Sequence, residues 1–356
     1  MNPKASRRTT LFGLTLILCL VLFQGQGCNG CNQPLQISDG FFSAIVRADG
    51  KIQTNFSTDG LNWQPGFIHA DLGTVDKGVG ITTDKAGVLV FLAFFTKNDA
   101  GSNKLFVRTG LGNNWETHTP TQINVNAASA PAICRIDDRF FFMAWNNGNG
   151  GISTSLFDKQ NLGTNNAFRL SGDINDNLAA GIEGTPSVTA LNNQILVVWQ
   201  TREGYASNIT SFNPANPNVS FGTSSALNVA PLRGTPVGPP QVTSDDARFV
   251  LSIGCQRSAG EDLVTHSFCY FISIDGRSWA AQACVSAPLV NLQVRPHSIA
   301  IDRNSQVAQL VAGSNDGRAE IMRNCGGSKR WRDNSAFNDE GALVLQPAIV
   351  FRKGNQ

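Results

Sequence analysis

A long internal repeat constrains the fold of this chain more than any other feature. The sequence Ser-x-Asp-Gly-x-x-Trp occurs intact at residues 57–63 and 273–279, and eroded copies occupy 109–115 and 324–331. A long period means that each unit buries its apolar face against the next, so the repeat decides the architecture before any local pattern does. The defining residues of the intact copies are Ser57, Asp59, Gly60, Trp63, Ser273, Asp275, Gly276 and Trp279.

Two further marks recur with a similar period. One is a proline that opens an apolar segment, and the steps between successive prolines are 55, 54, 56 and 51 residues. The other is a short polar turn, such as 137–138 or 245–246, followed by a dense apolar run. Asx residues at tight turns between β-rich runs are typical of hairpins. The prolines are Pro131, Pro186, Pro240, Pro296 and Pro347.

These marks predict four strands in each unit: a proline-started strand A, an apolar strand B, a strand C that ends in the Ser-x-Asp turn, and a strand D. Such four-stranded repeats are typical of propeller blades. The last strand A, 347–351, is expected to pair with strands at 41–47 and 51–57. The predicted fold is therefore all-β, a six-bladed β-propeller of four-stranded antiparallel blades. Its ring is closed by mixing N- and C-terminal strands in one blade, which removes open edges.

The first residues have the pattern of a targeting segment. Basic residues precede an apolar run at 11–23, and we predict a signal peptide over residues 1–27, a short linker over 28–35 and the propeller over 36–356. Two interpretations remain open. Cleavage before Cys28 gives a secreted protein, whereas Cys28 also resembles the lipidated cysteine of a bacterial lipoprotein. Both place the protein outside the cytoplasm, secreted or in the cell envelope.

Charge and cysteine content limit the partners. The net charge is +2 with no basic stripe, which excludes nucleic acid as the expected partner. We expect a monomer that binds a glycan or an extracellular or periplasmic protein and meets a membrane only through a lipid anchor. No Cys or His cluster has zinc spacing, so neither a metal nor a cofactor is expected. Cys269 and Cys284 flank the second intact turn and could form a disulfide across one hairpin, although spacing does not fix connectivity.

The motif Ser-x-Asp-Gly-x-x-Trp resembles the Asp-box, or BNR, repeat, and six such units resemble the sialidase-like β-propeller superfamily over roughly residues 36–356. In each box the Ser and Asp side chains are expected to accept hydrogen bonds from nearby backbone amides. Gly is expected to adopt a positive φ, and Trp to pack against the sheet. The box residues are therefore predicted to fasten hairpins rather than to form a site.

Strand alternation predicts where a site would lie. A–B and C–D turns share one face of a propeller, whereas B–C and D–A loops share the other, where the central channel opens and ligands usually bind. Polar residues after strand B and before strand A are the candidates. The predicted ligand-binding residues are Arg202, Gln256, Arg257, Arg295, His297, Asn315 and Asp316.

The resemblance implies a test for catalysis. A sialidase uses an arginine triad, a Tyr nucleophile primed by a Glu, and an Asp acid/base. This chain lacks the Arg-Ile-Pro motif and has two tyrosines, of which Tyr205 near Glu203 is the remaining, weak catalytic candidate. The leading hypothesis is therefore a non-catalytic glycan- or protein-binding propeller. The alternative is an extracytoplasmic sialidase-like exo-glycoside hydrolase.

Overall fold

The computed structural model describes most of the chain from residue 39 to residue 353. The described ranges are 39–60, 62–97, 103–111, 114–115, 121–162, 164, 166–229, 235–258, 264–286, 296–302, 307–311, 320–324, 331–334 and 345–353. The chain divides into two units, and all of these residues belong to Ser38–Asn355, which is described by itself. The signal peptide, the 28–35 linker and Cys28 lie outside the described residues and stay predictions.

The first three blades are consecutive antiparallel sheets, each hydrogen-bonded in chain order from its innermost strand outward. Blade 1 has an additional strand, β8. Both β7 and β8 pair with β6, β7 with its last residues and β8 with its first. Blade 1 contains β4 (Val79–Thr83), β5 (Leu89–Lys97), β6 (Asn103–Leu111), β7 (Asn114–Trp115) and β8 (Thr121–Val125); blade 2 contains β9 (Ala132–Arg135), β10 (Phe140–Asn146), β11 (Ile152–Asp158) and β12 (Phe168–Ile174); blade 3 contains β13 (Ile182–Leu191), β14 (Gln194–Thr201), β15 (Gly204–Ser211) and β16 (Ser225–Ala226).

The other three blades include the one that closes the ring. In blade 6 the innermost strand comes from the end of the sequence, and the next three come from its beginning. Blade 4 contains β17 (Thr235–Ser244), β18 (Phe249–Ser258), β19 (Val264–Ser273) and β20 (Ala280–Ser286); blade 5 contains β21 (His297–Ile301), β22 (Val307–Val311), β23 (Glu320–Asn324) and β24 (Trp331–Asn334); blade 6 contains β25 (Ala348–Arg352), β1 (Gly40–Val46), β2 (Ile52–Ser57) and β3 (Phe67–Ile68). The short helices are η1 (Ala70–Leu72), η2 (Lys159–Asn161) and α2 (Asn177–Ala180).

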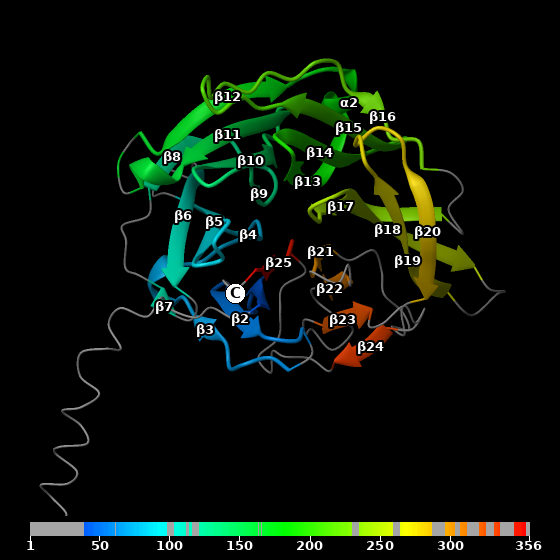
Figure 1. Ribbon diagram of the computed structural model, residues 1–356, viewed down its shortest axis with the longest axis horizontal. Helices are drawn as coiled ribbons and strands as arrows, with labels where there is room; N and C mark the ends of the chain where they lie inside the picture. The colour runs from blue at the N-terminus through cyan, green and yellow to red at the C-terminus, as the bar shows by residue number, and fades with distance from the viewer. Residues whose placement is uncertain are drawn as a thin grey trace, which may run out of the picture. The chain divides into compact units, whose positions relative to one another are not determined.

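The innermost strands form a closed ring. Each packs against that of the next blade, in the order β4, β9, β13, β17, β21, β25 and back to β4. Figure 1 shows these six strands nearest the centre, with β25 in red beside the blue strands of blade 6. At the closure, the Val79 amide donates to the Gln346 carbonyl at 3.1 Å. The expected all-β propeller, closed by strands from both ends of the sequence, is confirmed.

The core lies between the blades. Within the described residues every blade-to-blade interface holds its own cluster of buried apolar side chains. Phe91 and Phe141, for example, join blades 1 and 2 with ring centroids 4.3 Å apart. Such face-to-face packing of sheets explains why the apolar B strands are apolar on both faces: each lies between two neighbours.

Candidate ligand-binding face

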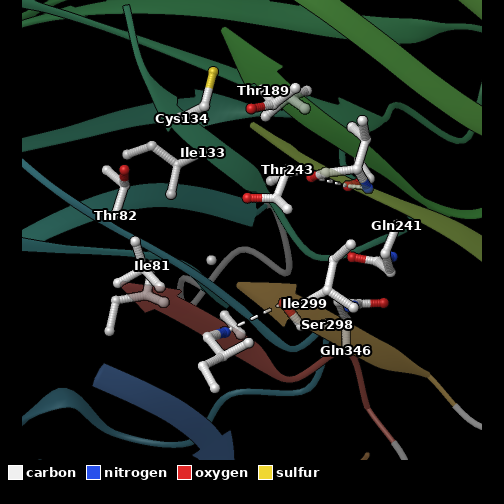
Figure 2. A pocket seen from close by; sticks show the side chains of 18 of the residues that line it. Ile81, Thr82, Ile133, Cys134, Thr189, Gln241, Thr243, Ser298, Ile299 and Gln346 are labelled. Carbon is white, nitrogen blue, oxygen red and sulfur yellow. Dashed lines mark hydrogen bonds between the residues drawn. The ribbon is translucent and has the colours of Figure 1, made fainter. Parts of the chain in front are cut away.

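The six inner strands surround a central cavity of 180 Å³. Its wall is built mainly from aliphatic, hydroxyl and amide side chains, and Figure 2 shows Thr82, Thr189, Gln241, Ser298 and Gln346 around it. Each contributing strand presents only an edge to the channel, which explains the narrow lumen. A cavity of this size has room for a few water molecules or one small group.

Channel hydroxyls hold neighbouring blades together. The Ile349 amide of blade 6 donates to Ser298 Oγ of blade 5 at 3.2 Å, and the Val242 amide of blade 4 donates to Ser187 Oγ of blade 3 at 3.0 Å. Figure 2 shows the bond to Ser298 as a dashed line. These hydroxyls satisfy edge-strand amides that have no partner in their own sheet. The first role of these hydroxyls is therefore to hold the blades together, and any role in ligand binding comes second.

The face formed by the B–C and D–A connections carries an exposed ion pair on blade 3. Arg202, in the β14–β15 turn, lies 3.9 Å from Glu183 on β13, measured from Nε to Oε1, and their side chains are 86% and 48% exposed. Thr185, two residues beyond Glu183, lines the channel cavity. The pair thus stands at the channel mouth, and its long contact leaves both groups free to bond a ligand.

Beside it, blade 2 presents an asparagine-rich β10–β11 turn on the same face. The Gly148 amide donates to Asn146 Oδ1 at 2.9 Å, and the Asn149 amide donates to Asn147 Oδ1 at 2.8 Å. Gly148 has a φ of +75°, a conformation that glycine adopts without strain. The turn therefore holds a set of amide groups at the surface in a defined geometry.

The structure places the two weak catalytic candidates, Tyr205 and Glu203, in different environments. Tyr205 is buried, its hydroxyl donates to the Gly238 carbonyl at 3.1 Å, and burial raises its pKa. Glu203 lies exposed in the preceding turn. A nucleophile must reach the substrate and be activated by a nearby base. The Tyr205 side chain is instead buried at the contact with blade 4, where its hydroxyl is bonded to a backbone carbonyl.

The other predicted ligand-binding residues do not gather at one described point. His297 is buried beside the Phe268 ring, its carbonyl accepts a 2.7 Å bond from Gln346 Nε2, and burial lowers the pKa of its imidazole to about 3. Gln256 is half-buried near the C-terminal end of β18, opposite Thr235. The Arg257 side chain and residues Arg295, Asn315 and Asp316 lie outside the described residues.

Both Asp-box turns have the expected geometry and lie on the opposite face. The Gly60 amide donates to Ser57 Oγ at 2.9 Å, and Gly60 has a φ of +72°. The Asn62 amide donates to Asp59 Oδ1 at 2.7 Å, and the partly buried Trp63 packs against the cluster between blades 5 and 6. The second box repeats this: the Gly276 amide donates to Ser273 Oγ at 2.9 Å, the Ser278 amide donates to Asp275 Oδ1 at 2.8 Å, and Trp279 packs between blades 3 and 4.

The A–B turn face also holds a cavity that the sequence did not indicate. It measures 420 Å³ and is lined by Arg135, Lys353 and the acidic turn residues 245, 246 and 302. Arg135 donates to the Asp84 carbonyl at 2.9 Å, and Lys353 pairs with Asp246. The recurring aspartates could have indicated this cavity. The sequence pattern instead indicates turn residues, because Asp at such positions usually caps its own turn. Asp245 does so, accepting from the Arg248 amide.

The disulfide predicted from spacing is present. Cys269 on β19 and Cys284 on β20 are joined, and the two residues face each other across the hairpin. A disulfide points to an oxidising, extracytoplasmic compartment. Cys134 and Cys255 are buried free thiols.

The arrangement of metal-ligating side chains and the character of the helices bear on metals and membranes. In the part of the chain that the structure describes, no group of three or more His, Cys, Asp or Glu side chains is arranged to hold a metal ion. The same residues contain no helix with the length and apolar character needed to cross a membrane.

No family model matches the sequence, and no curated protein matches it. Solved structures do. The six-bladed lectin of Aleuria aurantia, described by its fucose recognition mode, is 10% identical with a TM-score of 0.50, covering 86% of this chain and 97% of its own. TolB from Acinetobacter baumannii is 12% identical with a TM-score of 0.50, covering 88% and 67%.

AofleA from Arthrobotrys oligospora is 11% identical with a TM-score of 0.50, covering 75% of this chain and 73% of its own. Identities this low show a shared fold and nothing finer. The chain therefore shares its fold with these structures; in this chain it is a β-propeller of four-stranded antiparallel blades, and the first and last strands lie in one sheet.

Proposed function

We propose that this protein is an exported, non-catalytic propeller that binds a glycan at the channel mouth on the B–C/D–A face. The observation that carries the proposal is the Glu183–Arg202 pair, an exposed carboxylate and guanidinium 3.9 Å apart. A carboxylate accepts hydrogen bonds from sugar hydroxyls, a guanidinium donates to them, and the adjacent Asn turn supplies amides that do both. Charged groups of this kind form the stronger hydrogen bonds.

Two further observations support binding rather than turnover. Tyr205 is buried with its hydroxyl committed to a backbone carbonyl, which speaks against a nucleophile at that position. The two Asp-box turns favour a relationship to sialidase-like propellers in scaffold, and we propose that the chain shares their fold without their chemistry. The Cys269–Cys284 disulfide supports export, and so does the signal peptide predicted over residues 1–27, with or without a lipid on Cys28.

The test is a glycan array followed by titration calorimetry with the best ligand. Fucosides belong in the first panel because a protein of this fold recognises fucose. We expect the double variant Glu183→Gln/Arg202→Met to bind at least about tenfold more weakly, since each lost charged hydrogen bond contributes about 1.5–3 kcal/mol.

The matched control is Lys85→Met/Asp138→Asn on the A–B turn face, another exposed ion pair, with its charged atoms 3.8 Å apart. This control variant should bind the ligand with the same affinity as the wild type. An empty array, or equal losses in both double variants, contradicts the proposal. So does turnover of fluorogenic sialosides that Tyr205→Phe or Glu203→Gln abolishes.

A further inference from the structure

Three sulfur atoms lie close together in blade 4, on its three outer strands β18, β19 and β20. Cys269 is bonded to Cys284 across β19 and β20, and the Sγ atom of Cys255 on β18 lies 3.5 Å from the Sγ atom of Cys269. Register explains the contact. Cys269 stands opposite Ile253, so Cys255, two residues further along β18, projects from the same face of the sheet. A free thiol therefore touches one sulfur of the disulfide.

The surroundings distinguish the three cysteines. Cys255 and Cys269 are fully buried in the cluster between blades 3 and 4, whereas Cys284 is only partly buried at its margin. A reagent from solvent therefore reaches Cys284 more readily than Cys255. Exchange of the bond between these positions would convert an inaccessible thiol into an accessible one.

We propose that Cys255, Cys269 and Cys284 form an internal thiol–disulfide exchange site, in which Cys255 displaces Cys284 from its bond to Cys269. The Cys255 thiolate attacks Sγ of Cys269, a Cys255–Cys269 bond forms, and the Cys269–Cys284 bond breaks. The electron pair of the broken bond leaves with Cys284, which takes up a proton, while the proton of Cys255 has gone to solvent base. One disulfide and one thiol exist before and after, so no oxidant or reductant is needed.

Exchange is expected to be slow at neutral pH because Cys255 is buried. Burial raises the pKa of the Cys255 thiol to about 11, and the thiolate is the attacking species. Among the described side chains, the titratable group packed against Cys255 from a neighbouring element is Tyr205 of blade 3, whose own pKa is raised by burial and by Cys255. Tyr270, next to Cys269 in sequence, points the other way and bonds Gln309. The thiolate fraction should thus rise about tenfold per pH unit below 11.

The chain offers a direct readout. Cleavage after Arg248, Arg257 and Arg277 puts Cys255, Cys269 and Cys284 on three different tryptic peptides. Native full-length protein is incubated with iodoacetamide at pH 7.0, 8.5 and 10.0, quenched with acid, digested without reductant and mapped by mass spectrometry. We expect alkylated Cys284 together with a Cys255–Cys269 cross-linked peptide, increasing by about tenfold per pH unit.

Two variants separate exchange from other chemistry. Cys255→Ser should keep the Cys269–Cys284 bond and lose all Cys284 alkylation, whereas Cys134→Ser, another buried free cysteine, should behave as the wild type. Circular dichroism at each pH verifies that the protein is folded. The proposal is overturned if folded protein at pH 10 shows no Cys255–Cys269 peptide, or if Cys284 is alkylated equally in Cys255→Ser.

Discussion

The aspartate of each Asp box stabilises its turn by accepting hydrogen bonds from backbone amides. In the second box the amides of Ser278 and Arg277 both donate to Asp275, and these bonds lower the pKa of its carboxyl to about 2. Ser273 Oγ donates to the same carboxylate oxygen at 2.8 Å and accepts from Gly276. The carboxylate organises the turn in the way that an N-cap organises the first turn of a helix.

Asp275→Ala should lower the free energy of unfolding by about 1 kcal/mol at pH 7, the usual size of a lost cap. Because the folded pKa lies below the ordinary 3.8, the stabilisation from ionisation is complete above pH 4 and disappears as pH falls towards 2. Urea denaturation at pH 7 and at pH 3 measures both effects. Asp173→Ala, at an exposed strand position, is the control, and an equal loss there would contradict the cap interpretation.

The range of each residue's contacts explains which site residues could be predicted from the sequence. Asp59 and Asp275 were predictable as fasteners because the turn is local and all its partners lie within four residues. Tyr205 was not, because its environment depends on which face of β15 packs against blade 4. A shift of register by one residue reverses that face, and sequence spacing alone does not fix register.

Among the strands, β25 carries the closure of the ring. Ile349 is buried with Phe41 and Leu310 in the cluster between blades 5 and 6, and the Arg352 guanidinium lies over the Phe56 ring, 4.6 Å from its centroid. Five residues of β25 pair with β1 in antiparallel register. This short strand therefore binds both its own blade and the preceding one.

Ile349→Ala should lower the stability by about 2–5 kcal/mol, since it leaves a cavity at a buried interface. Thermal unfolding followed by circular dichroism measures the change. Ile274→Ala is the matched control because its side chain is 81% exposed, and it should leave the midpoint unchanged. Similar midpoints for the two variants would show that β25 is not a stabilising strand.

The recurring prolines predicted the inner strands but misplaced two of their starts. β13 begins four residues before Pro186, and β17 contains Pro236, Pro239 and Pro240. An edge strand tolerates proline because its outward amide needs no partner, and the pairing register shifts next to these prolines in both strands. The period could be taken from sequence, whereas the bulges depend on the neighbouring inner strands.

Across the whole molecule, stability is distributed over the blade interfaces, and two of these interfaces hold buried histidines. His69 lies between the Phe67 and Trp115 rings, where blades 6 and 1 meet, and His297 belongs to blade 5. Burial lowers the pKa of both to about 3, aided at His69 by the positive charge of Arg108. Both imidazoles are therefore neutral in the folded protein.

This predicts acid sensitivity with a defined sign. Unfolded histidine binds a proton below about pH 6.5, whereas the folded ones do not until about pH 3. Stability is thus full above pH 6.5 and falls as pH decreases, by about 1.4 kcal/mol per unit for each histidine. His297→Gln should flatten the fall between pH 6 and pH 4 in urea denaturation series. His69→Gln provides the second test if the first variant folds poorly, and unchanged slopes in both would refute the assignment.

The shared sheet of blade 6 also sets an order of events during synthesis. β1 and β2 leave the ribosome first, yet the strand that completes their sheet, β25, is made only after the other five blades. Their unpaired edge must wait while the strands of the other five blades are synthesised, and pairing across such a separation in sequence is slow. Closure of the ring consequently cannot precede the synthesis of β25, and a nascent chain that stops short of Arg352 exposes both the β1 edge and the apolar face that Ile349 would cover.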